Sequence, residues 1–431
     1  MPEQAKRAGG RTVVAQGLML SLLSLALTTA GQQWTQTTSL PDGYSGQSLV
    51  YWNGFLYQAG GMSNNNGILD GTNILYAQVY TNGTIGTWNM ATPLPDSVFY
   101  HAGVVANGFL YVLGGYHFNY QMSLICGYCG LFITNTVYYA KINPDGSVDV
   151  WQTTTPLPSP EYYFSAAVWN GRIYAAGGYD GNNFTNAVWS AQIQTDGSLS
   201  PWVAQAPLPE AIYCQAEVAN GMIYVLGGSL GNDIVVNNVY YSRINADGTL
   251  AGWNQTTPLP QPLCNFGAVA VGGRIFAAGG LNGSAPVNKS YSTAVAGDGT
   301  LGMWSSGPAF PFRLGQYGSA MYDFGITVTD SYIFVAGGTK VANYSAVYSL
   351  ALPSPPTTPA LVPQRFGTNG AFLVKMTSTT NTGFGLLAST NLTTWANISS
   401  GFTDTNGSLL LQDTNAANFP NRFYRVYWPL P

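Results

Sequence analysis

The sequence predicts an all-β fold: six copies of one four-stranded unit forming a six-bladed β-propeller, followed by a small β-sandwich. The first observation is a Trp that recurs about every 50 residues, which is the signature of a repeat architecture. The second is a Gly pair whose first Gly follows each Trp by 26, 26, 26, 25, 26 and 33 residues. The Trp residues are Trp34, Trp88, Trp151, Trp202, Trp253 and Trp304, and the pairs begin at Gly60, Gly114, Gly177, Gly227, Gly279 and Gly337.

Composition excludes two classes of protein. Only 7% of the 431 residues are charged, while 13% are aromatic and 52 are Gly. A disordered chain would be rich in charge and poor in aromatic residues. No basic run follows the N-terminal segment, so nucleic acid is not an expected partner.

Residues 1–30 read as a secretory signal peptide. Lys6, Arg7 and Arg11 precede a short apolar run that ends near Leu27, and small residues up to Ala30 follow. A basic segment, an apolar core and a small-residue cleavage site together describe such a signal. We therefore expect a secreted or cell-surface bacterial protein without a membrane span after cleavage. The alternative is an uncleaved membrane anchor.

Each repeat is predicted to contain four short strands joined by two tight turns. Asn-Gly between two β-prone runs is the strongest short hairpin signal, because a type I′ turn needs positive φ at both positions. A second turn, usually Asp-Gly, precedes the strand that carries the Trp. The first turns are Asn53-Gly54, Asn107-Gly108, Asn170-Gly171, Asn220-Gly221 and Gly272-Gly273; the second are Asn82-Gly83, Asp145-Gly146, Asp196-Gly197, Asp247-Gly248 and Asp298-Gly299.

The first and last copies are complementary fragments. The chain after the signal begins directly with a Trp strand at residues 33–38, whereas the sixth copy ends after one strand at residues 345–350. Together they make one complete blade. We therefore expect the N-terminal strand to close a six-bladed ring over residues 31–352, because closure removes open sheet edges.

Two further segments follow the ring. Residues 353–363 are rich in Pro and Thr and read as a linker. Residues 364–431 contain strand-like runs separated by Asn, Thr and Gly, which favour a small β-sandwich. The expected strands cover residues 372–376, 385–388, 409–412 and 422–427.

The repeat resembles the kelch repeat. The Gly pair, the spaced Trp and the Tyr shortly before the pair carry the resemblance; these Tyr are Tyr57, Tyr111, Tyr174 and Tyr224. It implies a propeller, a fold that hosts both enzymes and binding modules. Kelch repeats usually carry an Arg after the Pro-containing segment, and here only the sixth copy does, at Arg313. Residues 388–395 and 421–426 resemble a short terminal domain of secreted bacterial proteins.

Loop length places the candidate site. Two-residue turns line one face of the ring, whereas the connections after the Gly pair and after Pro-Leu-Pro are longer and emerge on the opposite face. Binding residues concentrate on loops that a rigid scaffold holds. Aromatic, amide and guanidinium groups there suit a glycan or a protein, although many of these Tyr could pack between blades. The candidate ligand-binding residues are Tyr44, Tyr100, His101, Tyr162, Tyr163, Tyr213, Asn265, Arg313 and Tyr317.

The second repeat has the longest insertion, and it contains Cys126 and Cys129. In an exported protein a close Cys pair most often forms a local disulfide, which we predict here. Reduced thiols, or a metal or redox site, are the alternatives. Cys214 and Cys264 lie at different offsets from their Gly pairs and are not expected to pair.

The function that these residues favour is binding of a glycan or an extracellular protein, rather than catalysis. The alternative is a sugar mutarotase or epimerase, in which Glu161, Glu217 and Arg313 would relay a proton near the channel. Two His, His101 and His117, do not forbid a copper centre like that of galactose oxidase, but the domain that completes such a site is not recognisable. No cofactor and no metal are predicted.

Overall fold

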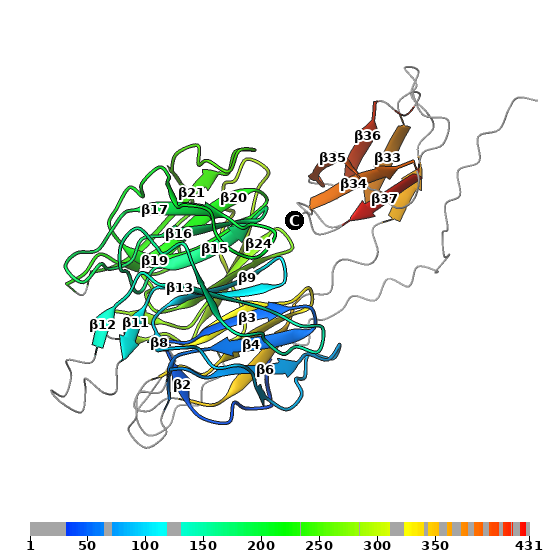
Figure 1. The fold of residues 1–431 in the computed structure, drawn as a ribbon. Helices are drawn as coiled ribbons and strands as arrows, with labels where there is room; N and C mark the ends of the chain where they lie inside the picture. The colour runs from blue at the N-terminus through cyan, green and yellow to red at the C-terminus, as the bar shows by residue number, and fades with distance from the viewer. Residues whose placement is uncertain are drawn as a thin grey trace, which may run out of the picture. The chain divides into compact units, whose positions relative to one another are not determined.

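The structure is a computed structural model that describes residues 32–352 and 360–427 with gaps, so the predicted signal segment, residues 1–30, lies outside it. In the first range it omits residues 64–70, 119–130, 233, 284, 311–322 and 340–343. In the second it describes residues 360–363, 372–377, 383–390, 396–404, 408–414, 416 and 423–427. All regular elements in the described part of the chain are β-strands, apart from an isolated 3₁₀ position (Figure 1).

Residues 32–352, as far as they are described, form six four-stranded antiparallel sheets. The first three are β3 (Ser48–Trp52), β4 (Phe55–Ala59), β6 (Ile74–Gln78) and β7 (Asn89–Met90); β9 (Ala102–Ala106), β10 (Phe109–Leu113), β13 (Val137–Lys141) and β14 (Gln152–Thr154); and β15 (Ser165–Trp169), β16 (Arg172–Ala176), β17 (Val188–Gln192) and β18 (Val203–Ala204). The last three are β19 (Tyr213–Ala219), β20 (Met222–Ser229), β21 (Val235–Arg243) and β22 (Asn254–Gln255); β23 (Gly267–Val271), β24 (Arg274–Ala278), β27 (Ser290–Ala294) and β28 (Ser305–Ser306); and β29 (Gly325–Val328), β30 (Tyr332–Ala336), β31 (Val347–Ala351) and β1 (Trp34–Thr37).

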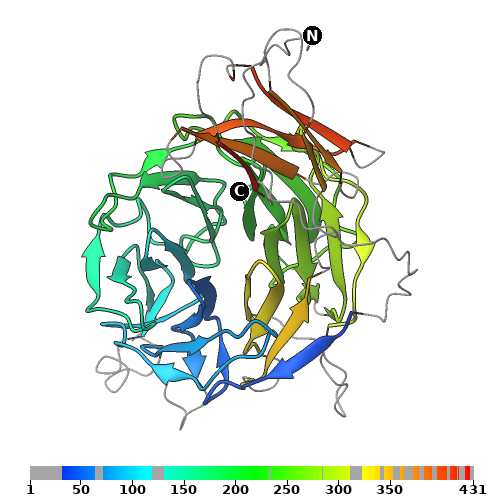
Figure 2. The same ribbon diagram turned by 90° about the vertical axis from the view of Figure 1, so that its right-hand side faces the viewer.

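The sheets form a closed ring, as the sequence predicts for a propeller. The first strand of each sheet contacts the first strand of the next, in the order β3, β9, β15, β19, β23 and β29, and β29 contacts β3. The ring is completed by β1, which pairs with β31 so that Trp34 lies opposite Leu350 and Thr37 opposite Val347. Figure 2 shows this blue strand beside the orange end of the ring. The predicted closure by the N-terminal strand is thus confirmed.

Both kinds of predicted turn form, each with its own backbone. At Asn53-Gly54 and its four counterparts both residues have positive φ, as a type I′ hairpin requires. At the Asp-Gly turns only the Gly does, and the Asp side chain accepts from the residue after the Gly; Asp145 Oδ1, for example, accepts from the Ser147 amide at 3.0 Å. The first kind of turn fixes the register of the first and second strands, and the second kind fixes that of the third and fourth.

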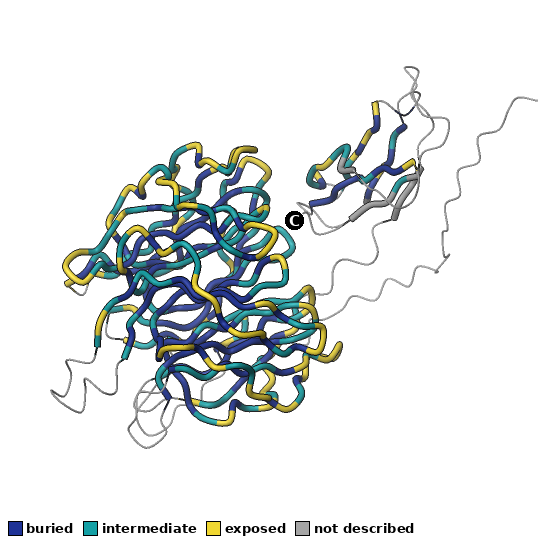
Figure 3. Tube along the Cα trace, viewed as in Figure 1, coloured by how far each residue is buried: buried dark blue, intermediate teal, exposed yellow. Residues whose placement is uncertain are grey.

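The recurring Trp and Tyr join one sheet to the next. Five Trp indoles donate to the backbone carbonyl four residues after the preceding Trp, as Trp202 does to Thr155 at 3.1 Å. Tyr224 donates from its hydroxyl to Gly299 in the next repeat at 2.8 Å, and Tyr111 and Tyr174 do the same. Each buried cluster contains residues of two neighbouring sheets. Figure 3 shows the buried residues in dark blue along the inner parts of the strands.

Three small sheets extend the long-loop connections of the ring. They are β2 (Tyr44–Ser45) with β5 (Met62–Ser63), β25 (Leu281–Asn282) with β26 (Ala285–Pro286), and β8 (Ser97–Phe99) with β11 (Tyr116–Phe118) and β12 (Leu131–Ile133). The last sheet includes the described ends of the long insertion. Cys126 and Cys129, whose disulfide was predicted, lie outside the described residues.

The C-terminal residues form two three-stranded antiparallel sheets. One contains β32 (Ala360–Pro363), β33 (Phe372–Thr377) and β36 (Ser408–Asp413), and the other β35 (Ala396–Phe402), β34 (Gly383–Ser389) and β37 (Phe423–Tyr427). Side chains of both sheets share one buried cluster, in which Val374 and Leu386 are almost fully buried. Residues 360–363 belong to the segment that the sequence analysis assigned to the linker; their pairing with β33 places them in the sheet.

Candidate functional site

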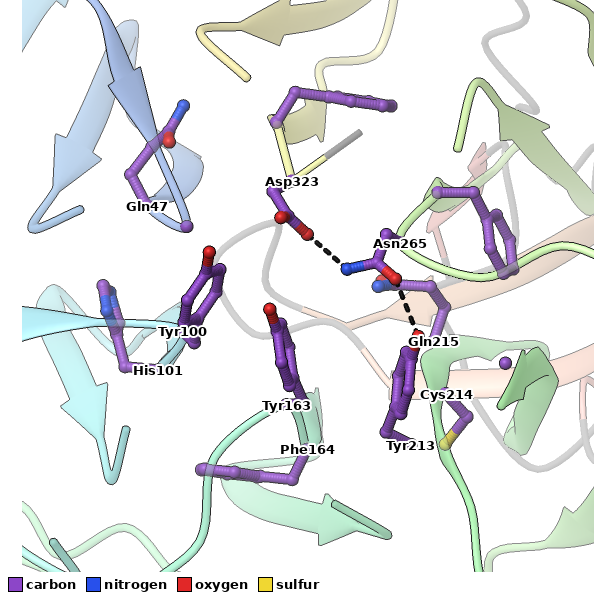
Figure 4. A pocket seen from close by; sticks show the side chains of 14 residues that line it. Gln47, Tyr100, His101, Tyr163, Phe164, Tyr213, Cys214, Gln215, Asn265 and Asp323 are labelled. Carbon is purple, nitrogen blue, oxygen red and sulfur yellow. Dashed lines mark hydrogen bonds between the residues drawn. The ribbon is translucent and has the colours of Figure 1, made fainter. Parts of the chain in front are cut away.

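A pocket of about 110 Å³ lies where the first strands of the six repeats begin. Each repeat contributes the residue 14 positions before its first paired Gly. In five repeats this residue lies two positions before the first strand, and in the fourth it is the first residue of β19. Figure 4 shows the side chains that converge on this space. The six equivalent residues are Gly46, Tyr100, Tyr163, Tyr213, Asn265 and Asp323.

The backbone at this position is unusual in the same way around the ring. Five of the six residues have positive φ, between 50° and 65°; Tyr213, next to a bulge in β19, is the exception. Asn and Asp adopt this left-handed conformation more readily than other side chains, but Tyr rarely does, and strained residues cluster at functional sites. Amide groups donate around the circle, from Tyr100 to Gly46 at 2.8 Å and from Gly46 to Asp323 at 3.0 Å.

The side chains form a ring of aromatic and polar groups. Tyr163 lies between Tyr100 and Tyr213, with ring centroids 4.4 Å and 5.3 Å away. The Tyr213 hydroxyl donates to Asn265 Oδ1 at 2.7 Å, and Asn265 Nδ2 donates to Asp323 Oδ1. These bonds fix the orientation of the Asn265 amide. In Figure 4 the hydroxyls of Tyr100 and Tyr163 and the Asp323 carboxylate point into the same space.

Burial sets the charges of the pocket. It raises the pKa of Asp323 to about 6, although the hydrogen bond from Asn265 acts in the opposite direction. Burial, with a smaller contribution from His117, lowers the pKa of His101 to about 3, so that this ring is neutral at pH 7. Burial also raises the pKa of Cys214 to about 12, and Cys214 and Cys264 are both unpaired. Near pH 7, Asp323 is the charged side chain among the residues that line the pocket.

A belt of partly exposed aromatic residues flanks the pocket. Along it, ring centroids of Tyr116 and Tyr162 are 4.3 Å apart, those of Tyr162 and Tyr179 5.5 Å, and those of Tyr179 and Phe184 5.0 Å. The belt contacts the pocket at two points, where Tyr162 lies 5.0 Å from Tyr163 and Phe184 lies 5.8 Å from Tyr213 between ring centroids. We call Tyr116, Tyr162, Tyr179 and Phe184 the aromatic belt.

The structure divides the predicted site residues into three groups. Those that line the pocket are Tyr100, His101, Tyr163, Tyr213 and Asn265. Tyr162 lies in the aromatic belt. Tyr44 is only 3% exposed and belongs to the core cluster around Leu49, so its ring packs in the core rather than at the pocket. Arg313 and Tyr317 lie outside the described residues.

Neither carboxylate of the enzymatic alternative lines the pocket. Glu161 is 2% exposed and accepts from Ser159 Oγ at 2.9 Å, and its burial raises its pKa to about 7. Glu217 lies on the innermost strand β19 and accepts from the Ala270 amide of the next sheet; burial raises its pKa to about 8. The two side chains have neighbours in different parts of the ring.

Fourteen residues line the pocket, and the sequence analysis named five of them as ligand-binding residues. The nine that it missed are Gly46, Gln47, Phe164, Cys214, Gln215, Gly228, Phe266, Asp323 and Phe324. Most of these nine follow from a signal that is present in the repeats. Aligning the repeats on their Gly pairs and taking the residues 14 and 13 positions upstream selects Gly46, Gln47 and Asp323 together with the Tyr residues. Residue type within each loop does not by itself distinguish these positions.

The described residues contain no group of three or more His, Cys, Asp or Glu that could hold a metal ion. Within the same residues, no helix has the length and apolar character needed to cross a membrane.

Known proteins match the ring. Beta-scruin of Limulus polyphemus is 26% identical over 214 residues, which are 48% of this chain and 22% of that protein. Kelch repeat and BTB domain-containing protein 12 of Danio rerio is 30% identical over 192 residues, 41% of this chain and 28% of that protein. The chain thus spans less than a third of the length of these curated relatives.

A solved structure and a family match agree with these relatives. The structure described as "Structure of YjhT" aligns with a TM-score of 0.57 at 12% identity, over 74% of this chain and 97% of that one, which shows a common fold. The family "KLHDC2/KLHL20/DRC7 Kelch-repeats domain" matches residues 46–280. With the Gly pairs, the spaced Trp and the closed ring of antiparallel sheets, this match shows that the chain belongs to the kelch-repeat family.

Proposed function

We propose that this protein recognises a glycan through the pocket and the aromatic belt on the long-loop face of its propeller. Kelch-repeat propellers generally mediate binding. The observation that supports a glycan is the continuity of the partly exposed belt with a polar pocket. Aromatic rings stack on the apolar faces of sugars, and a few placed polar groups fix the orientation.

Pocket size and chemistry favour a sugar residue over a large apolar group. A space of about 110 Å³ suits one small moiety, and Tyr213, Asn265 and Asp323 offer it a hydrogen-bonded network. Kelch domains typically bind proteins, so a protein that covers the same face is the competing interpretation. A protein partner would need about 800 Å² of buried surface on each side.

The sugar-isomerising alternative has less support. Its proton relay needs two groups within reach of one ligand. Glu161 and Glu217 do not line the pocket, and each is engaged with a neighbour of its own.

We also propose that the protein acts outside the cell, after export through residues 1–30. The C-terminal sheets would then attach or space the propeller. These proposals rest on the basic, apolar and small-residue order of the N-terminal segment.

Glycan-array screening followed by calorimetry tests the proposal. Tyr162→Ala should weaken binding of the glycans found about three- to tenfold, because an aromatic contact contributes about 0.5–1.5 kcal/mol. Tyr80→Ala is the matched control, since Tyr80 is 47% exposed and lies outside the belt and the pocket. Absence of glycan binding by the native protein would refute the proposal. Sugar turnover that Glu217→Gln abolishes would favour the enzyme.

A further inference from the structure

Gln47 presents an unused hydrogen-bond acceptor at the pocket. Its side chain is 6% exposed, and Nε2 donates to the Ala336 carbonyl at 2.8 Å. That bond fixes the amide, and Oε1 is left buried without a partner. A buried acceptor without a donor is unfavourable. Because Gln47 itself lines the pocket, a bound ligand could supply a donor after a small movement of the amide.

Asp323 presents a second unused acceptor. Asn265 donates to Oδ1, and no other side-chain hydrogen bond to this carboxylate is seen among the described residues. A carboxylate has about four acceptor positions. Asp323 and Gln47 come from the two repeats that meet where the ring closes, and the Gly46 amide donates to the Asp323 carbonyl at 3.0 Å. The two residues therefore line neighbouring parts of the pocket, and in Figure 4 the Asp323 carboxylate points toward Asn265.

The charge of the pocket also favours a ligand group that donates hydrogen bonds. Its described lining contains no Lys or Arg, and the one His accepts or donates through Nε2 to Ser48 Oγ at 3.0 Å. Tyr163 and Tyr213 both lie close enough to Asp323 for its charge to affect their pKa values, which burial already raises. A negative site walled by aromatic rings attracts a cation.

We propose that the pocket binds the primary ammonium group of an amino sugar. An ammonium group carries three donors and no acceptor, so it can donate to the open positions of the Asp323 carboxylate and neutralise it, with Gln47 Oε1 as a further acceptor nearby. The rest of the sugar chain would continue onto the aromatic belt. This inference rests on the proposed glycan binding and specifies its chemistry.

The test compares chitosan oligomers with chitin oligomers of equal length by calorimetry on the full chain. The two differ in whether the amine is free or acetylated. Chitosan should bind at least about tenfold more tightly, because a charge-assisted hydrogen bond is worth about 1.5–3 kcal/mol. In the unmodified protein this preference should weaken as the pH falls below about 6, where Asp323 takes up a proton.

Two variants complete the test. Asp323→Asn should remove the preference for chitosan, whereas Asp330→Asn, at an exposed turn residue, should retain it. Equal binding of chitin and chitosan would overturn the ammonium site while leaving glycan binding intact. Binding of neither oligomer, with binding of other glycans on an array, would also overturn it. Binding of a lysine-containing peptide and of no glycan would overturn both proposals.

Discussion

At the scale of single residues, the pocket depends on left-handed backbone at one repeated position. Gly46 is the member of this set without a side chain, and its φ is +65°. A Cβ there would lie 2.8 Å from Cδ1 and Cε1 of Tyr100. Glycine is thus required for the approach of the Tyr100 ring as well as for its φ.

Gly46→Ala should therefore lower stability more than Gly54→Ala does. Gly54 also has positive φ, +91°, but no atom lies within 4 Å of its added Cβ, so it serves as the control for backbone strain alone. We expect the control to cost about 1 kcal/mol and Gly46→Ala about 1–3 kcal/mol more. Urea unfolding measures both, and equal losses would contradict the steric role of Gly46.

A second prediction at this scale concerns Glu217 and pH. Burial raises its pKa from 4.5 to about 8. The native state therefore holds a proton that the unfolded chain releases, and stability falls as the pH rises from about 4.5 to about 8. Glu217→Gln cannot lose this proton, so its stability should fall less between pH 5 and pH 9. The other buried carboxyl groups are the same in both proteins, and parallel curves from thermal unfolding would contradict the prediction.

At the scale of elements, the recurring Tyr of the second strand connects one repeat to the next. On the second strands β10, β16 and β20, its hydroxyl reaches over to the turn carbonyl of the next repeat. Tyr57, at the same position of β4, is fully buried, and its hydroxyl has no partner. Tyr57 and Tyr224 therefore allow a comparison of the same Tyr without and with its hydrogen bond to the next repeat.

Tyr224→Phe should lower the free energy of unfolding by about 1 kcal/mol, because the Gly299 carbonyl loses its donor. Tyr57→Phe removes a hydroxyl that makes no hydrogen bond and should be neutral or stabilising. Chemical denaturation of the two variants gives the difference directly. An equal or larger loss for Tyr57→Phe would contradict the prediction.

At the scale of the whole molecule, the ring depends on its first strand. β1 pairs with β31, and Trp34 packs against Phe310 with ring centroids 5.3 Å apart in an edge-to-face arrangement. Without β1, the edge of β31 would be open, and an open edge invites association with another chain.

A chain beginning at residue 39 should therefore unfold at a lower temperature than one beginning at residue 32, and it should associate in solution. The second chain is the control, because it lacks only the residues before β1. Thermal scanning and light scattering measure the two effects. Identical melting and a monomeric shorter chain would show that closure contributes nothing.

The sequence by itself determined the all-β propeller, its closure by β1 and the turn chemistry, because each depends on local rules repeated six times. A Gly pair, an Asn-Gly turn or a spaced Trp has the same consequence in every copy. Tyr100, His101, Tyr163, Tyr213 and Asn265 could also be predicted, because each closely follows the Pro-containing segment of its repeat. The strands at residues 360–363 and 396–402 were missed, since short polar segments form strands only when a neighbouring strand pairs with them.

Only the tertiary structure decided which residues of the long-loop face meet. Closing the ring brings Gln47 of the first repeat next to Asp323 of the last, 276 positions apart in sequence, and turns Tyr44 into the core. It also separates Glu161 and Glu217 from the pocket. The reason is physical: residue type gives the chemistry of a side chain, but its position relative to the ring axis and its burial give it a partner and a charge.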